Sequence, residues 1–181
     1  MPLPSALDEH YYTLSRAHIM EHLRKHLEPV PDGRILEIGP ELRWPEFDTL
    51  DIRPGSMFQG DITRRVDIPD SSYDIVLAME VLEHTTHPFD ALDEIRRLMK
   101  PGGLLLASAP MNFREHGPLP DAWRFTRHGW RILLKDWDEL DMDVLMTPGR
   151  ALMPLHINVS ARCNKMKEIY PSSMTFPMEQ A

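Results

Sequence analysis

The stretch Ile35-Leu-Glu-Ile-Gly-Pro-Glu-Leu-Arg-Trp44 decides how the rest of the sequence is interpreted. Its first four residues are typical of a short buried strand, which runs directly into Gly39. In open α/β sheets, the loop after such a strand is where a nucleotide is bound. Further glycines normally follow in such a loop, but here Pro40, Leu42 and Trp44 follow instead. The stretch therefore predicts an α/β sheet with an unusual first loop.

Working outward, further apolar runs predict the remaining strands of this sheet. The runs are apolar throughout rather than alternating, which is typical of a parallel sheet that is covered on both faces. The first loops are too short for crossover helices, because a parallel connection needs about a dozen residues or more. We expect strands over 34–38, 48–52, 57–59, 73–79 and 104–109, helices over 88–100 and 126–135, and a final strand pair over 140–146 and 155–161.

This order predicts a mostly parallel α/β sheet with a C-terminal antiparallel strand pair and reduced helices in its first half. Residues 5–28 are expected to form an amphipathic helix that begins at a capping box of Ser5 and Asp8. Its histidines at i, i+4 spacing could form a metal stripe, but a half-buried histidine face is favoured. We expect one domain over 1–163 and a loosely held tail over 164–181.

Composition excludes several classes of partner. The net charge of −8 argues against a surface that follows long DNA or RNA. No apolar run approaches the roughly 20 residues that a membrane span needs. The single Cys163 excludes an internal disulfide and fits a reducing compartment. We therefore expect a cytoplasmic protein with neither nucleic acid nor membrane as partner; the oligomeric state is not predicted.

Carboxylates stand at the ends of four successive expected strands: Glu37, Asp51, Asp61 and Glu80. Buried strand ends are costly places for acids, so several of them together indicate a polar ligand. Asp51 stands where a carboxylate can accept both hydroxyls of a ribose. Asp61 is spaced to receive the exocyclic amine of an adenine. For each acid taken alone, a loop-capping role is an equal alternative.

Six segments between Arg34 and Ala161 resemble the class I S-adenosylmethionine-dependent methyltransferases, in particular the small type 11-like family. They are ILEIG, TLDI, GDI, SSYDIVLAMEVLEH, LDEIRRLMKPGGLLLASAP and DAWRFTRHGWRILL. The resemblance implies a single Rossmann-like domain that binds S-adenosylmethionine. It places Glu37 and Gly39 at the methionine end of the cofactor, Asp51 at the ribose, Asp61 at the adenine and Glu80 beside the transferred methyl group. Neighbouring residues complete the expected cofactor site: Pro40, Ile52, Ile62 and Met79.

Methyl transfer requires alignment of the acceptor with the methyl group and is helped by a base. His84 and His116 are the candidate catalytic bases, although a structural hydrogen bond from His84 to a neighbouring loop is the competing interpretation. Three aromatic residues, Phe113, Trp123 and Phe125, could form an apolar wall around the acceptor.

A metal is a further alternative. Glu80, Glu83 and His84 resemble the metal-binding triplet of the ubiquinone-pathway O-methyltransferases, but the same string occurs in many metal-free relatives. We predict no metal.

The predicted function is methyl transfer from S-adenosylmethionine to oxygen or nitrogen of a small-molecule acceptor. A non-catalytic methyltransferase-like binding module is the first alternative, because the loop after Gly39 is poor in glycine. A nicotinamide-dependent oxidoreductase is disfavoured, because the G-x-G-x-x-G fingerprint is absent. Trp44 is expected to pack at the sheet edge in place of the missing helix.

Overall fold

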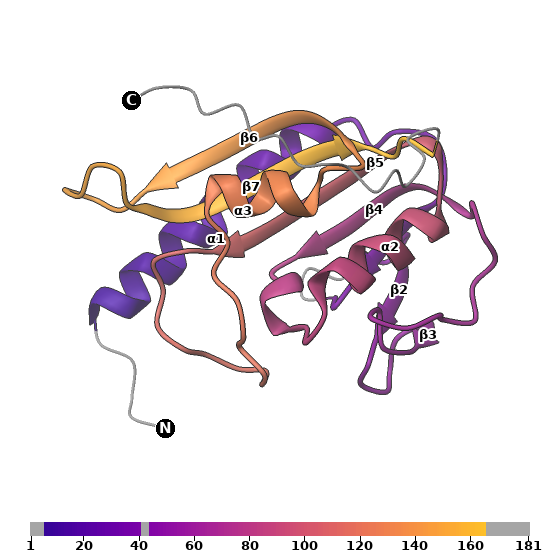
Figure 1. Ribbon diagram of the computed structural model, residues 1–181, viewed down its shortest axis with the longest axis horizontal. Coiled ribbons are helices and arrows are strands. Elements are labelled where there is room, and N and C mark those ends of the chain that lie inside the picture. Colours follow the sequence, from indigo (N-terminus) through magenta and orange to yellow (C-terminus); the bar gives the residue numbers. More distant parts are fainter. Residues whose placement is uncertain (1–5, 41–43, 166–181) are drawn as a thin grey trace, which may run out of the picture.

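Seven strands form one sheet in the order β3-β2-β1-β4-β5-β7-β6 (Figure 1). The computed structural model describes residues 6–40 and 44–165. Strands β1 to β5 pair in parallel, and β7 is antiparallel to both of its neighbours. The strands are β1 (Ile35–Ile38), β2 (Asp48–Asp51), β3 (Phe58–Gln59), β4 (Tyr73–Met79), β5 (Met99–Pro110), β6 (Asp138–Met146) and β7 (Pro154–Arg162). This confirms the mostly parallel sheet with its C-terminal antiparallel pair.

The two faces of the sheet carry separate apolar cores. Helix α1 (Ala6–Leu27) crosses one face, where Ile19, Leu23 and Leu27 pack on side chains of β1, β4 and β5 (Figure 1). Helices α2 (Pro88–Leu98) and α3 (Arg127–Leu133) lie on the other face. Because β1 lies between β2 and β4, the strand order reverses at β1, and ligands bind outside the carboxyl ends of strands at such a point.

Most expected elements are present, with differences at their ends. Strand β4 has the expected bounds, and Thr126 caps α3 by accepting a hydrogen bond from the Gly129 amide. Strand β5 begins at Met99 instead of residue 104, because Met99 already pairs with Tyr73 before a bulge. A short 3₁₀ helix, η1 (Leu82–His84), was not expected.

The first half of the sheet has reduced helices, as expected: between β1 and η1 the described residues form no helix. Trp44 and Phe47 lie in this connection with ring centroids 5.1 Å apart, and both pack against the apolar core on the α1 face. Trp44 therefore covers the face of the sheet rather than its edge. Residues 41–43, Ser5 of the expected capping box and residues 166–181 of the expected tail lie outside the described residues.

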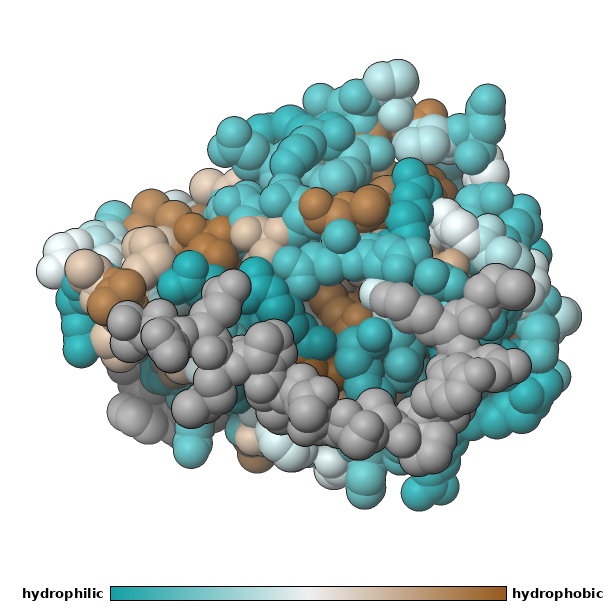
Figure 2. Space-filling view, turned by 45° about the horizontal axis from the view of Figure 1, so that its top comes forward, coloured by the Kyte–Doolittle hydropathy of each residue, from teal (hydrophilic) through white to brown (hydrophobic). Residues whose placement is uncertain are grey.

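Hydrophobic residues on the face shown in Figure 2 lie in small patches among hydrophilic ones. The largest exposed apolar side chains come from separate parts of the chain, including Ile52, Phe89, Leu119 and Leu152. None of the helices in the described ranges is both long enough and apolar enough to cross a membrane. The placement in the cytoplasm stays a prediction.

Candidate functional site

The expected cofactor residues gather at the carboxyl ends of β1 to β4. Glu37 is buried in β1, and Gly39 follows with its amide donating to the Leu50 carbonyl at 2.9 Å. Gly39 has φ +62°, and a Cβ there would lie 3.1 Å from Cγ2 of Val81. Glycine is thus required by backbone conformation and space together. Pro40 is buried directly after it.

Asp51 at the end of β2 is engaged by its own neighbour. The Arg53 amide and guanidinium donate to the Asp51 carboxylate at 2.8–3.3 Å. Burial opposes ionisation, but these hydrogen bonds outweigh it and lower the pKa of Asp51. Arg53 is 60% exposed whereas Asp51 is 9% exposed, so a ribose could replace the arginine at this carboxylate. Beside it, Ile52 is 65% exposed and offers an apolar surface at the strand end.

Asp61 makes the loop-capping contacts that were the alternative to a cofactor role. One carboxylate oxygen, Oδ1, accepts hydrogen bonds from the Thr63 amide and hydroxyl at 2.9 and 2.8 Å, which is a loop-capping role. The other, Oδ2, lies 4.0 Å from the exposed Arg64 guanidinium. The next residue, Ile62, and Met79 at the end of β4 are both buried. The cofactor roles of these residues stay predictions.

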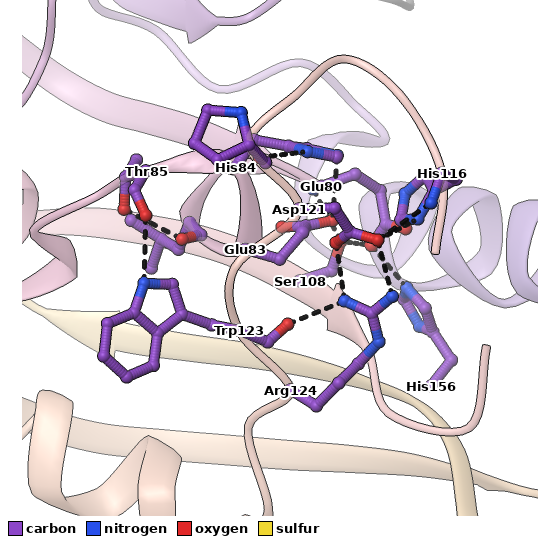
Figure 3. Close-up of polar contacts among 12 residues, drawn as sticks. Glu80, Glu83, His84, Thr85, Ser108, His116, Asp121, Trp123, Arg124 and His156 are labelled. Carbon is purple, nitrogen blue, oxygen red and sulfur yellow. Dashed lines mark hydrogen bonds and ion pairs between the residues drawn. The ribbon is translucent and has the colours of Figure 1, made fainter. Parts of the chain in front are cut away.

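Glu80 follows β4 with φ +56°, an uncommon conformation for a side-chain-bearing residue and one that gathers at functional sites. Its carboxylate is held from two strands, as Figure 3 shows. The Ser108 hydroxyl donates to Oε1 at 2.9 Å, and Nε2 of His156 lies 2.7 Å from the same oxygen. Burial raises the pKa of Glu80, but His156 and Ser108 outweigh it and leave the pKa below its usual value.

The loop between β5 and α3 is held by hydrogen bonds to residues that follow the end of β4. The Ala122 and Trp123 amides donate to the Glu83 carbonyl, and the Trp123 indole donates to the Thr85 carbonyl (Figure 3). These bonds tie the loop to η1 and the residues after it. The loop therefore forms a fixed wall on this side of the site.

Within this loop, Asp121 orients His116. Nδ1 of His116 lies 3.0 Å from the Asp121 carboxylate, which also accepts two hydrogen bonds from Arg124 at 2.6 and 2.7 Å (Figure 3). Burial opposes ionisation of Asp121, but Arg124 and His116 outweigh it and lower the pKa to about 2. A carboxylate on Nδ1 leaves Nε2 of His116 available to the cavity. Sequence reasoning missed Asp121, although it stands only five residues after His116.

His84 makes the structural contact that competed with a catalytic role. Its Nδ1 lies 3.1 Å from the Pro120 carbonyl, so Nδ1 carries the hydrogen and Nε2 stays free of one in the neutral ring. Burial lowers the pKa of His84 and favours that neutral ring. His84 and His116 stand edge to face with centroids 4.8 Å apart, so the structure brings the two candidate bases together.

Ligand-type atoms of Glu83, His84 and His116 lie within 4.8 Å of one another in the described chain. This group differs from the triplet that the sequence suggested, because the Glu80 carboxylate is directed to Ser108 and His156. Glu83 is fully buried, and burial together with Glu80 raises its pKa well above the usual value. The absence of a metal stays a prediction.

A cavity of about 630 Å³ opens beside Glu80. The first half of α1 forms one wall with Asp8, Tyr12 and Arg16, and the loop residues Phe113 and His116 form another. The expected aromatic wall is wrong for two of its three members. Phe125 is buried against Trp130 of α3, and Trp123 stacks on Phe125 outside the cavity lining.

Residues 45–107 match the methyltransferase domain family. A hybrid PKS-NRPS synthetase from Fusarium sp. (strain FN080326) is 27% identical over 145 residues, which are 71% of this chain and 4% of that protein. This chain thus spans a small fraction of the first curated relatives that it matches.

Solved structures share the fold. The CurJ carbon methyltransferase has a TM-score of 0.60 at 19% identity, over 85% of this chain and 55% of that one. The N-methyltransferase NodS from Bradyrhizobium japonicum WM9, in complex with S-adenosyl-l-homocysteine, has a TM-score of 0.57 at 17% identity, over 81% and 86%. At these identities the likeness shows the fold alone.

Proposed function

We infer that the chain, a class I S-adenosylmethionine-dependent methyltransferase by its fold and its family match, methylates oxygen or nitrogen of a small-molecule acceptor. The fold and family match confirm the resemblance, the enzyme class and the cofactor that were expected from the sequence. The acceptor atom and the residue roles are proposals. The observation that carries them is the cavity beside Glu80, His84 and His116, at the carboxyl end of β4.

The strand ends fit the cofactor. Gly39 turns the backbone at the end of β1 with φ +62°, the buried Asp51 carboxylate can accept ribose hydroxyls, and the exposed Ile52 side chain can cover an adenine. When bound, S-adenosylmethionine would supply an electrophilic methyl group on a sulfonium leaving group, and the acceptor would gain this methyl group and lose one proton.

The protein's part is to position the acceptor and to remove its proton. His116 is oriented for this by Asp121, and His84 has its Nδ1 fixed by the Pro120 carbonyl. Phe113, whose ring stands edge to face with His116, adds apolar surface to the cavity. Asp8 and Arg16 add charge on the α1 side, so the cavity suits a small acceptor with both polar and apolar parts.

A carbon acceptor is the second candidate. It is favoured by the similarity to a carbon methyltransferase and to a PKS-NRPS synthetase. The binding-module alternative requires that the rebuilt first loop has cost catalysis, whereas the oriented bases at the cavity support an enzyme.

The test is transfer of label from methyl-tritiated S-adenosylmethionine to three small-molecule sets: phenols and alcohols, amines, and β-keto thioesters. Binding of S-adenosylhomocysteine and NAD is measured in parallel by calorimetry. We expect S-adenosylhomocysteine to bind, NAD not to bind, and label to enter an oxygen or nitrogen acceptor. Label only in the thioesters would favour the carbon acceptor, and binding without transfer to any set would favour the binding module.

A further inference from the structure

The contact between α1 and β7 contains a buried strip of polar side chains. Along β7, the fully buried His156, Asn158 and Ser160 alternate with Ile157 and Val159. Since successive strand residues face opposite sides, the polar ones share one face. That face meets α1, because Asn158 donates to the His18 carbonyl at 3.2 Å. Burial of polar groups costs free energy unless they are paired, so this strip needs an explanation beyond packing.

Part of the strip is a continuous chain of polar contacts. Nε2 of His156 lies 2.7 Å from Oε1 of Glu80, and Nδ1 of His156 lies 3.2 Å from Nδ1 of His18. Nε2 of His18 in turn lies 3.0 Å from Oδ2 of Asp143. The contacts thus run from Glu80, directly after β4, through His156 of β7 and His18 of α1 to Asp143 of β6.

The two end members of this series of polar contacts, Glu80 and Asp143, lie at different surfaces. Glu80 lines the cavity assigned to the acceptor. Asp143 on β6 is 45% exposed and lines a separate groove of about 760 Å³ between α1 and β6. His156 is fully buried, and the His18 side chain is 11% exposed. This series of polar contacts therefore connects the acceptor cavity with water on another side of the molecule.

The number of protons that these polar contacts can hold indicates a function for them. Each of the three contacts can hold one proton, with His18 Nε2 and Asp143 standing as an ion pair at 3.0 Å and the other two contacts as hydrogen bonds. Two neutral imidazoles supply only two protons. The neutral chain therefore has room for one more proton, and a carboxylate at each end favours the resulting imidazolium. Burial opposes that charge and lowers the pKa of His18, although Asp143 acts in the opposite direction. The chain can thus take up a proton and release it again.

We propose that Glu80, in place of the two candidate histidines His84 and His116, is the catalytic base and that His156, His18 and Asp143 form a proton relay from the acceptor cavity to the groove between α1 and β6. This proposal rests on the proposed function. The bond from the acceptor atom to its hydrogen breaks, the electrons stay on the acceptor, and the proton passes to a Glu80 oxygen. The added proton converts the histidine pair to an imidazolium, and one proton leaves His18 for water beside Asp143.

Other ionisable groups face the relay at each end. His116 of the loop and Glu83 of η1 lie near Glu80. Glu21 of α1 acts on His18, and His22 lies beside Asp143. The Arg124 guanidinium also acts on Glu80 and Glu83. The carboxylates of Glu80 and Asp143 are the charged groups in direct contact with the histidine pair.

The first test uses nuclear magnetic resonance of the full chain labelled with ¹⁵N-histidine, titrated between pH 5 and pH 9 without ligand. We expect His18 and His156 to take up one shared proton, with ring-nitrogen signals of both residues moving together. Asp143→Asn should lower the midpoint by about one pH unit, because it removes the facing carboxylate. The matched control is Asp141→Asn, which removes the same charge two residues away on β6, where it pairs with Lys25 instead of His18.

The second test follows methyl transfer to the acceptor found in the labelling assay. We expect Glu80→Gln to lower kcat about 100-fold, the usual contribution of a general base. Asp143→Asn should lower kcat several-fold with KM and S-adenosylhomocysteine affinity unchanged. Asp141→Asn should leave all three quantities unchanged.

Independent titration of the two histidines, or an Asp143→Asn variant equal to Asp141→Asn in both tests, would overturn the relay while methyl transfer itself stands. Failure of the wild-type chain to bind S-adenosylhomocysteine would overturn the proposed function and the relay together.

Discussion

Asp51 is paired with its exposed neighbour Arg53, and we propose that a ribose takes the place of the arginine when the cofactor binds. We expect Asp51→Asn to weaken S-adenosylhomocysteine binding by about 1.5–3 kcal/mol, because charge-assisted hydrogen bonds to the ribose are lost. Folding should change little, since the side chain that loses its partner, Arg53, is 60% exposed. Calorimetric titration and thermal melting of the variant measure both quantities.

Arg53→Ala is the control for this prediction. It frees the Asp51 carboxylate, so binding should stay equal to wild type or become tighter. If Asp51→Asn binds as tightly as wild type, or if Arg53→Ala weakens binding as much as Asp51→Asn does, the ribose does not bind at Asp51.

A comparison of Gly39 with Gly149 separates the effect of backbone conformation on stability from the effect of an added Cβ on ligand binding. Gly39→Ala places a Cβ at φ +62° and 3.1 Å from Val81, whereas Gly149→Ala does so at φ +72° in open space. Each should lower the free energy of unfolding by about 1–2 kcal/mol, the cost of a left-handed residue. Only Gly39→Ala should also weaken S-adenosylhomocysteine binding. Equal binding by both variants would show that the first loop has no contact with the cofactor.

At the scale of elements, α1 makes stability depend on pH through His22. Its side chain is buried against β6 and β7, and burial, with a smaller effect of His26, lowers its pKa to about 4. Asp141 and Asp143 act in the opposite direction. Because the unfolded chain binds this proton below about pH 6.5 and the folded chain does not, stability falls as the pH falls from 6.5 towards 4, by up to about 3 kcal/mol.

His22→Leu should remove this part of the pH dependence, and His10→Leu, at an exposed position near the start of α1, should not. Chemical denaturation of both variants at pH 7 and pH 5 measures the difference. An unchanged slope in His22→Leu would mean that folding does not lower the pKa of His22.

In the described part of the connection between β1 and β2 there is no helix, and Trp44 and Phe47 pack against the apolar core on the α1 face. Trp44→Ala should lower the free energy of unfolding by about 2 kcal/mol, below the 3–5 kcal/mol of a fully buried tryptophan because the side chain is only partly buried. Leu152→Ala removes an apolar side chain that is 85% exposed and should have almost no effect. The prediction fails if thermal melting gives both variants the same stability.

At the scale of the whole molecule, the sequence predicted what depends on local pattern. Strand β4 and the start of α2 follow from an apolar run and from Pro88 at the first helical position. The extended path through Pro101-Gly102-Gly103 was missed, because such residues usually end an element and here tertiary pairing of β5 continues past them. The fate of Phe125 depends on packing against α3, which no local pattern reveals.

In the candidate site, too, some features could be predicted from the sequence and others could not. Its strand-end acids were predictable, because strand ends are visible in the sequence and parallel strands end at one edge. His156 and His18 were not predictable as a pair, since 138 residues separate them and their contact depends on how α1 crosses β7. The hydrogen bond between Ser108 and Glu80 was not predictable either, because it joins side chains of different strands.

Ligand binding should stabilise the molecule as a whole, because the acids of β1, β2 and β4 come together only in the folded sheet. A ligand at about 100 times its dissociation constant adds about 2.7 kcal/mol to the free energy of unfolding. For a chain of this size, S-adenosylhomocysteine should then raise the melting temperature by about 5–10 °C. NAD at the same concentration should cause no shift, and Asp51→Asn should reduce the shift at fixed ligand concentration. A flat response to millimolar S-adenosylhomocysteine would mean that this first loop, rebuilt around Pro40 and Trp44, has closed the cofactor site.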